Sequence, residues 1–461
     1  MKKSSLLKLS TTAAAIAILP FTTLAPTPVA QAEQCTSQST SQVGSPKANA
    51  AADLLGSFAG SSFGGSSLSP AQADAVKQAT STGVAKQLIT AEGPTRSMHF
   101  LTGPSSPDRT DRKWGITSTD LGIAYLDDSE ENTPRMYLAF GDTFSCSGSG
   151  NGWRSNVLLR TRDFNYGDGV SLHQALTSDG WQSSGTAREF ISSEKNPGVE
   201  HTTIPTAGIE INGTHYIDYM SVKKWPKDAP WVTNYAATMK STDDGRTWSV
   251  VGDSTRVNEH ATNDIILPGR KGYDTGNEKL QMSAFLQTPD KDGYVYRYST
   301  PNGRAGTAYL SRAKESEFPS ESAFEYWDGH SWSSDRRDLE PVFGPSNPGK
   351  LGEMSVVYNK YINKYVALYL DSAKYALVMR TADTPEGEWS APRELISGHD
   401  VPQLYGGFIL PKLDDQNLYY VLSTWGDYNT YVMRTDLDYA VNNPSADISV
   451  KVVGDVVAEG K

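Results

Sequence analysis

The sequence is poor in cysteine and histidine, and it has no excess of positive charge. Its 461 residues include only two cysteines and seven histidines, and the formal net charge is −11. The histidines are scattered and none clusters with a cysteine, so no zinc-binding spacing is recognisable, and we expect neither a metal nor another cofactor. The acidic balance argues against nucleic acid or an anionic membrane surface as a partner.

The two cysteines leave two alternatives open. In an oxidising compartment Cys35 and Cys146 could form a disulfide, which would tie the start of the mature chain to a glycine-rich loop. The other alternative is a pair of free thiols, and the sequence does not decide between them.

Long apolar runs are absent as well, and the one apolar segment near the start of the chain is short. Basic residues among the first eight positions, an apolar segment over 12–20 and a small-x-small motif at 30–32 predict a secretory signal peptide over 1–32. The apolar segment is too short to span a bilayer, and Cys35 lacks the Leu-x-x-Cys context of a lipoprotein anchor. We therefore expect a mature chain from Glu33 that is secreted and extracytoplasmic, either free or associated with the cell wall.

The sequence is rich in aromatic side chains and glycine. It contains 23 Tyr, 10 Trp, 13 Phe and 40 Gly, a composition that favours an all-β fold with frequent turns. Aromatic faces also stack on sugars, although we expect most of these side chains to fill the core. Together with the acidic charge, this composition points to a neutral carbohydrate as the ligand.

Residues 33–94 are predicted to form a Ser/Ala/Gly-rich leader with one short helix. The first part of this segment is low in complexity and weakly apolar. Ser69-Pro70 has the pattern of a helix N-cap followed by a first-turn proline. Residues 71–89 are rich in Ala, Lys and Gln, which favours a helix that Gly93-Pro94 would end.

From residue 95 onward the chain is built of repeats. Each repeat has a small-residue strand, a turn, a Tyr-rich strand and then an apolar strand that ends in a basic or polar residue. Three of the turns, at Asn212-Gly213, Asp292-Gly293 and Asn363-Lys364, suit tight hairpins. The third strand recurs five times, as VLLRTRD, ATMKSTD, AYLSRAK, LVMRTAD and VMRTD.

Five repeats of this size predict a five-bladed β-propeller over 95–445, with 446–461 as a tail or closing strand. One repeat alone cannot bury both faces of its sheet, whereas radial stacking of five repeats can. Residues 241–248 match the S-x-D-x-G-x-T-W pattern of an Asp-box, in which the Asp caps the turn and the Trp packs between sheets. Asp-boxes occur on propellers of very different activities, so this motif supports the fold and says little about function.

Three carboxylates are expected at the funnel that the first strands of the blades form. Asp120 and Glu353 stand where two of these strands begin, and Asp142 ends the strand that pairs with the one after Asp120. Glycoside hydrolysis needs one carboxylic acid to protonate the leaving oxygen and one carboxylate as base or nucleophile. Asp120 and Asp142 are therefore the candidate catalytic pair, with Glu353 as a possible third carboxylate.

Each of these acids also has a purely structural interpretation. Asp120 could cap a turn, Asp142 has a counterpart in Asp371 at a comparable strand end, and Glu353 could bond to backbone amides of the channel.

Four further residues are candidates for substrate binding. Arg154 could hold a carboxylate in its ionised form or bind sugar hydroxyls, although a surface role is the commoner fate of an arginine. His201 follows Glu200 and could equally be a hydrogen-bonded structural histidine. Tyr405 and Trp425 could offer stacking faces or pack in the core.

The motifs around these residues resemble a known family. Eight motifs occur in the order found in a family of secreted five-bladed propellers. They are TDLG at Asp120, FGDTF at Asp142, WRSNVLLR, IPTAGIEINGTHYIDYMSV, TPNGRAGTAYLSR, EYWDG, GEMSVVYN at Glu353 and VMRTDL. That family was long catalogued as a domain of unknown function and was later assigned as endo-D-arabinofuranosidases. The resemblance covers residues 95–440. The leader and Cys146, in the loop after FGDTF, depart from the pattern.

The resemblance implies hydrolysis of internal α-D-arabinofuranosyl linkages in the arabinan of mycobacterial-type cell walls, with Asp120 and Asp142 as the catalytic pair. It does not imply which Asp is the acid, or whether the reaction inverts or retains configuration. We expect a monomer with a polysaccharide substrate. The alternatives are a non-catalytic carbohydrate-binding propeller and a sialidase-like hydrolase, which would need an arginine cluster that the funnel positions do not supply.

Overall fold

The computed structural model describes residues 86–90, 93–129, 133–145, 152–196, 198–226, 230–259, 275–304, 306–344, 350–425 and 428–457. The predicted signal peptide, most of the predicted leader and both cysteines lie outside these residues, so the disulfide stays a prediction. Among the described residues, no helix combines the length and apolar character that crossing a bilayer requires.

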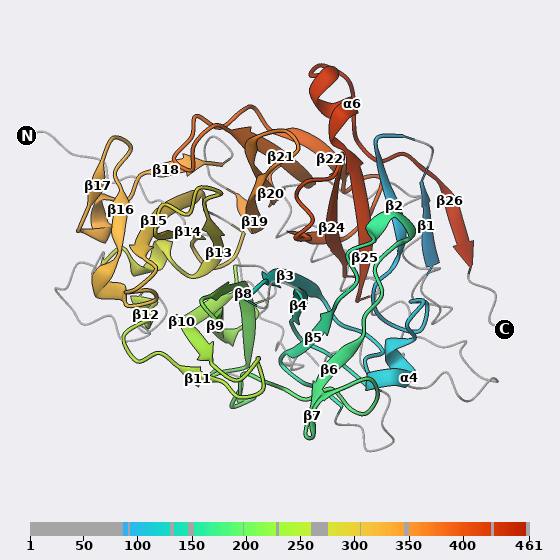
Figure 1. The fold of residues 1–461 in the computed structure, drawn as a ribbon, viewed down its shortest axis with the longest axis horizontal. Helices are drawn as coiled ribbons and strands as arrows, with labels where there is room; N and C mark the ends of the chain where they lie inside the picture. Colours follow the sequence, from blue (N-terminus) through green and yellow to red (C-terminus); the bar gives the residue numbers. More distant parts are fainter. Residues whose placement is uncertain are drawn as a thin grey trace, which may run out of the picture.

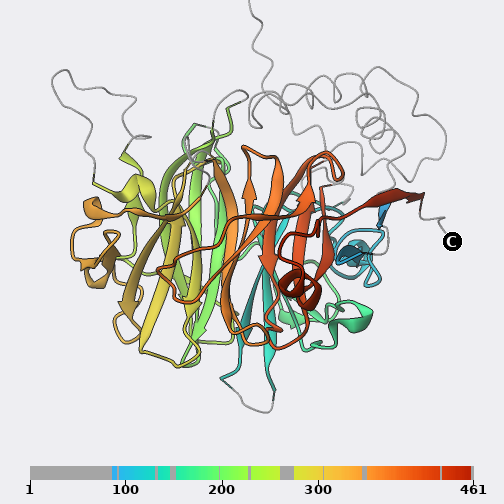
Figure 2. The same ribbon diagram turned by 90° about the horizontal axis from the view of Figure 1, so that it is seen from above.

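Five antiparallel sheets surround a common centre, which confirms the predicted all-β, five-bladed β-propeller (Figure 1). The inner strands β3, β8, β13, β19 and β23 contact one another in a closed ring, each packing against the next and β23 against β3. Figure 2 shows the strands of the blades running through the thickness of the molecule. The third strand of each blade carries the sequence repeat described above.

Each blade has four to six strands, and in blades 1 to 4 the first strand along the chain is the innermost. Blade 1 contains β3 (Leu121–Asp127), β4 (Arg135–Phe140), β5 (Val157–Thr161), β6 (Gln174–Thr177) and β7 (Gly180–Gln182). Blade 2 contains β8 (Thr202–Ile211), β9 (Thr214–Lys224), β10 (Val232–Ser241), β11 (Ser249–Val250) and β12 (Arg256–Val257). Blade 3 contains β13 (Met282–Gln287), β14 (Tyr294–Thr300), β15 (Ala308–Lys314), β16 (Glu325–Trp327), β17 (Trp332–Ser333) and β18 (Pro341–Phe343). Blade 4 contains β19 (Leu351–Asn359), β20 (Lys364–Asp371), β21 (Ala376–Ala382) and β22 (Arg393–Ser397).

Blade 5 joins strands from both ends of the propeller. Its inner strands are β23 (Leu404–Ile409), β24 (Asn417–Thr424) and β25 (Asn429–Asp436), and its outer strand is β2 (Thr95–Phe100). In Figure 1, β2 in blue lies beside β25 in red. The ring is therefore closed by pairing the first propeller strand with the last one, antiparallel from Thr95 opposite Thr435 to Phe100 opposite Tyr431.

Short helical segments lie between the strands and at the end of blade 5. They are α4 (Thr110–Trp114), η1 (Tyr166–Asp168), η2 (Asn277–Lys279), η3 (Glu321–Ala323), η4 (Arg336–Asp338) and α6 (Leu437–Asn442). The leader helix predicted over 71–89 is wrong for its last residues, because β1 (Lys86–Thr90) is a strand that pairs with β26 (Val452–Val457). The end of the chain, predicted as a tail or closing strand, thus contributes β26 to a separate two-stranded sheet and to none of the five blades.

The predicted turns are confirmed in part. Asn212 and Gly213 both have positive φ, 50° and 80°, and form a two-residue connection between β8 and β9. Asp292-Gly293 and Asn363-Lys364 instead end longer connections, over 288–293 and 360–363. In the Asp-box, Asp243 Oδ1 accepts hydrogen bonds from Ser241 Oγ and Thr247 N, 2.8 Å each, as the motif predicts.

Candidate active site

One face of the propeller collects two sets of segments from every blade. Each inner strand begins there, and each second strand ends there, because the two pair antiparallel: Leu121 with Phe140, Thr202 with Val222, Met282 with Thr300, Leu351 with Asp371 and Leu404 with Thr424. We call this face the funnel face. The loops between the second and third strands therefore also lie on it.

The inner strands are irregular where they reach the funnel face. Four of the five shift register near their first residues, between Leu121 and Ile123, Pro205 and Ala207, Leu351 and Met354, and Tyr405 and Phe408. Leu121 has a φ of 71°, which is unfavourable for a branched side chain. Bulges of this kind redirect side chains and are common beside functional sites. In this propeller the bulges of β3 and β19 lie beside Asp120 and Glu353.

Asp120 is a buried acid at the start of β3, 9% exposed. Its Oδ2 accepts hydrogen bonds from the hydroxyls of Tyr405 (2.9 Å) and Tyr428 (3.2 Å), whereas Oδ1 has no partner among the described residues. Loss of solvation raises the pKa of Asp120 to about 8, and the negative charge of Asp142 acts in the same direction. The two tyrosine hydrogen bonds oppose this rise.

Gly141 provides the space that Asp120 occupies. A Cβ at position 141 would lie 2.4 Å from Asp120 Oδ1, which is closer than side chains tolerate. Asp120 therefore packs against the backbone of the residue just before Asp142.

Asp142 follows β4 and is partly exposed. Its Oδ1 accepts hydrogen bonds from Trp153 Nε1 (2.7 Å) and from the hydroxyl of Thr202 (2.8 Å), at the start of β8. Loss of solvation raises the pKa of Asp142 to about 6, while these hydrogen bonds and the charge of Lys195 favour the ionised form. The two acids therefore differ in proton affinity although their charges interact.

Glu353, in the bulge of β19, is held by an arginine. Arg304 donates to both of its carboxylate oxygens, at 2.6 and 3.0 Å. The charge of Glu353 also contributes to the raised pKa of Asp120, after that of Asp142. Glu353 thus belongs to the funnel, as expected, and an arginine side chain rather than backbone amides binds it.

The predicted stacking residues lie together on blade 5. The Trp425 ring is 44% exposed and lies 6.2 Å from the Tyr405 ring and 5.4 Å from the Tyr428 ring, centroid to centroid. Tyr405 is buried and bonds to Asp120, so of the two predicted residues Trp425 offers the accessible face. Sequence reasoning missed Tyr428, which lies just before β25 outside every repeat.

His201 and Arg154 differ in what they contact. The His201 ring lies 5.4 Å from the ring of Trp153, the tryptophan that bonds to Asp142, and burial lowers the pKa of His201. Arg154 donates to the backbone oxygens of Ala187 (2.7 Å) and Gly115 (2.6 Å). The expectation that Arg154 holds a catalytic carboxylate or sugar hydroxyls is therefore not supported, because its guanidinium is buried against backbone carbonyls.

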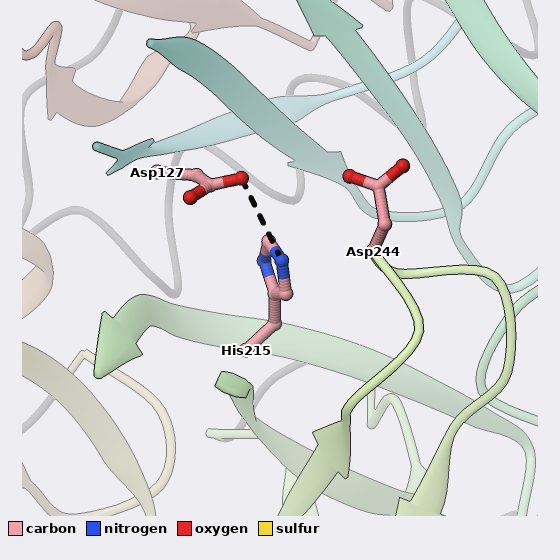
Figure 3. A group of neighbouring side chains, drawn as sticks. All are labelled: Asp127, His215 and Asp244. Carbon is pink, nitrogen blue, oxygen red and sulfur yellow. Dashed lines mark ion pairs between the residues drawn. The ribbon is translucent and has the colours of Figure 1, made fainter. Parts of the chain in front are cut away.

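A second acidic group lies on the opposite face, between blades 1 and 2. Asp127, His215 and Asp244 come from β3, β9 and the Asp-box turn, and their ligand atoms lie within 4.8 Å of one another (Figure 3). Asp127 Oδ2 is 3.8 Å from His215 Nε2. Asp244 Oδ2 is 2.7 Å from Arg160 Nη1, and Arg135 lies close to both carboxylates, at 3.4 and 3.8 Å. Arginines already balance these charges, so the cluster fits an ionic clamp between blades better than a cation site.

A cavity of about 550 Å³ lies beside this clamp. Its lining includes Arg160, Arg188 and Trp181, but Arg160 is paired with Asp244, and Arg188 donates to three backbone oxygens. The cavity is thus remote from the funnel face, and the two arginines named here are already engaged.

Comparison with known proteins gives a family and a set of distant relatives. Residues 105–434 match the model of a domain of unknown function, DUF4185. Notoamide biosynthesis cluster protein J from Aspergillus sp. (strain MF297-2) is 27% identical over 344 residues, which cover 70% of this chain and 84% of that protein.

Among solved structures, an exo-beta-1,3-galactanase from Phanerochaete chrysosporium aligns with a TM-score of 0.45 and 10% identity, covering 80% of this chain and 71% of that one. An arabinanase from Bacillus subtilis aligns with a TM-score of 0.41 and 12% identity, covering 72% and 98%. At this level of identity the likeness is one of fold alone.

Proposed function

Because this chain belongs to the DUF4185 family, folds as a five-bladed propeller and presents two acids on its funnel face, we propose that it is a secreted glycoside hydrolase acting on the internal α-D-arabinofuranosyl linkages of cell-wall arabinan. The observation that supports this most directly is the pair Asp120 and Asp142. They lie on one wall of the funnel, and their surroundings give them pKa values of about 8 and about 6. Two acids with separated proton affinities are what acid–base hydrolysis of a glycoside needs.

The surroundings of the two acids support a different role for each. At neutral pH Asp120 is mostly protonated, and the hydroxyls of Tyr405 and Tyr428 hold its carboxyl group in place. Asp120 is therefore the general acid. Asp142 is mostly ionised at the same pH, and Trp153 and Thr202 hold its carboxylate in place. Asp142 is therefore the base or nucleophile.

In the reaction, Asp120 gives its proton to the glycosidic oxygen while the bond from that oxygen to the anomeric carbon breaks. If water is the attacking group, Asp142 takes its proton as the new bond forms, and the configuration inverts. If Asp142 attacks first, a covalent intermediate forms and water then releases it with retention. The anomeric form of the first product, followed by NMR, separates the two courses.

The proposal is tested on purified arabinogalactan with the wild-type protein, Asp120→Asn and Asp142→Asn. We expect oligo-arabinosides from the wild type and a loss of roughly 10³-fold or more in each variant, since each removes one essential proton-transfer or nucleophilic group. Circular dichroism and melting curves show whether each variant is folded.

The same experiment addresses the alternatives. Binding of arabinogalactan without any product from the wild type would contradict hydrolysis and leave a carbohydrate-binding propeller. A sialidase-like activity is not favoured, because among the described funnel residues Arg304 is engaged by Glu353 and Arg154 by backbone carbonyls.

A further inference from the structure

Two tryptophans on the funnel face are exposed to an unusual degree for such large apolar side chains. Trp225 is 39% exposed and Trp425 is 44% exposed. Trp225 follows β9 and Trp425 follows β24, so both stand where a second strand ends at the funnel face. They belong to blades 2 and 5, on either side of blade 1, which carries Asp120 and Asp142.

A continuous series of contacts connects the two tryptophans. The Trp225 ring lies 5.3 Å from the ring of Trp231, and the Arg304 guanidinium lies 5.1 Å from Trp231 and 5.3 Å from Tyr405. Tyr405 in turn contacts Trp425, with ring centroids 6.2 Å apart. We call these five residues the aromatic path.

The aromatic path passes directly beside the proposed catalytic acid. Its fourth member, Tyr405, donates a hydrogen bond to Asp120, and its third member, Arg304, is paired with Glu353. The path therefore extends from the reacting centre in two directions, a short one to Trp425 and a longer one through Arg304 and Trp231 to Trp225.

The chemistry of the path suits a sugar chain. The exposed rings of Trp225 and Trp425 can pack against the C–H faces of sugar rings, whereas Trp231 and Tyr405, 8% and 4% exposed, are buried and support them from behind. The indole N–H of Trp231 is buried and has no acceptor among the described residues. One monosaccharide at the acids would leave the Trp225 end of the path uncovered, whereas a chain of several sugars would cover it.

We propose that Trp225, packed against Trp231, forms a distal subsite, and that an extended polysaccharide chain spans the funnel face from Trp425, past Asp120, to Trp225. This inference rests on the proposed function and specifies it: the substrate is recognised as a chain occupying sites on both sides of the acids. Attack within a chain, rather than at its end, follows from that arrangement.

The test measures binding with turnover suppressed. In the Asp120→Asn protein, the Kd for D-arabinan polymer and for a short arabinofuranosyl oligosaccharide is measured by titration calorimetry, with and without Trp225→Ala. We expect Trp225→Ala to weaken polymer binding by about tenfold, and to weaken binding of the short oligosaccharide less. The matched control is Tyr439→Ala, since Tyr439 is 41% exposed but lies on α6, beyond the opposite end of β25.

Equal polymer affinity in the Trp225→Ala and Tyr439→Ala proteins would overturn the distal subsite. The proposed function is judged separately, in proteins that retain Asp120. Products from the wild type together with an unchanged KM for polymer in Trp225→Ala would remove the subsite and keep the hydrolase. Weaker polymer binding in Trp225→Ala without any product from the wild type would keep the subsite and remove the hydrolase.

Discussion

At the scale of single residues, the proton affinity of Asp120 depends on neighbours that can be changed one at a time. Tyr405 and Tyr428 lower its pKa by hydrogen bonding to the carboxylate, and the charges of Asp142 and Glu353 raise it. For the proposed mechanism, the rate rises as Asp142 deprotonates near pH 6 and falls as Asp120 loses its proton near pH 8.

Tyr428→Phe removes a hydrogen bond that favours the charged form of Asp120. The pKa of Asp120 therefore rises, and we expect the alkaline limb of the kcat/KM profile to move to higher pH. Glu353→Gln removes a negative charge, so the same limb should move to lower pH. The acidic limb, which Asp142 sets, serves as the internal reference. If the alkaline limb of the kcat/KM profile stays at the same pH in both variants, the group that titrates there is not Asp120.

Gly141→Ala should displace the Asp120 carboxyl, because the new Cβ would come within 2.4 Å of Oδ1. We expect kcat to fall by about 10²-fold, the scale of a small misplacement of a catalytic group. Gly252→Ala is the matched control, since a Cβ there meets nothing within 4 Å. Equal kcat in the two variants would contradict the tight fit.

Asp120→Asn should stabilise the protein in a pH-dependent way. The pKa of Asp120 is about 8 in the native state and near 3.8 in the unfolded chain, so the native state binds the proton more tightly between these values. The wild type therefore loses stability as pH rises from about 4 to about 8, whereas Asn does not titrate. We expect a Tm gain of a few degrees at pH 8 that vanishes near pH 4. The exposed Asp290→Asn controls for the change in net charge.

Sequence reasoning singled out the carboxylates of the funnel and Tyr405, but not Tyr428 or Arg304, which bind Asp120 and Glu353. Asp120, Asp142 and Glu353 follow from strand order, because antiparallel pairing fixes which strand ends meet. Tyr428 and Arg304 lie in loops between the second and third strands, which carry no repeat. Every loop between a second and a third strand lies on the funnel face, so the position of Tyr428 and Arg304 in such loops was the signal that could have identified them.

At the scale of elements, the Asp-box of blade 2 acts as a clamp on blade 1. Asp244 accepts hydrogen bonds from Tyr137 and Arg160, and its backbone oxygen accepts one from Trp181 Nε1 at 2.7 Å. The sequence motif predicted the turn and the packing of its Trp. It did not predict the role of Asp244, because the partners come from a neighbouring repeat, between 63 and 107 residues away.

Asp244→Ala should destabilise the fold by about 1–3 kcal/mol, because it removes the carboxylate that pairs with the partly buried Arg160 and leaves Arg135 with Asp127 alone of its two neighbouring carboxylates. Chemical denaturation measures the change. The control is Asp383→Ala, which breaks an exposed pair with Lys364 and should change the free energy of unfolding little. Equal losses in the two variants would mean that the clamp contributes nothing beyond a surface ion pair.

At the scale of the whole molecule, closure of the ring depends on β2. The repeat pattern predicted five blades but not this strand, because TRSMHF lacks the signature of the third strands it lies beside. A chain that starts at Gly93 keeps β2 and should unfold cooperatively. A chain that starts at Leu101 leaves the edge of β25 unpaired, and we expect it to aggregate or to lose its sharp melting transition. Identical melting curves would show that closure does not need β2.

The direction of the β2–β25 pair also decides how the ring responds to tension. Thr95 lies opposite Thr435, so the chain enters β2 and leaves β25 at the same end of the pair. A pull on the segments before β2 and after β25 acts along the inter-strand hydrogen bonds and breaks them one after another, instead of loading all of them at once. The β2–β25 pair would therefore open at low force in a propeller pulled at both chain ends, whereas it would bear no load in a propeller attached at one end.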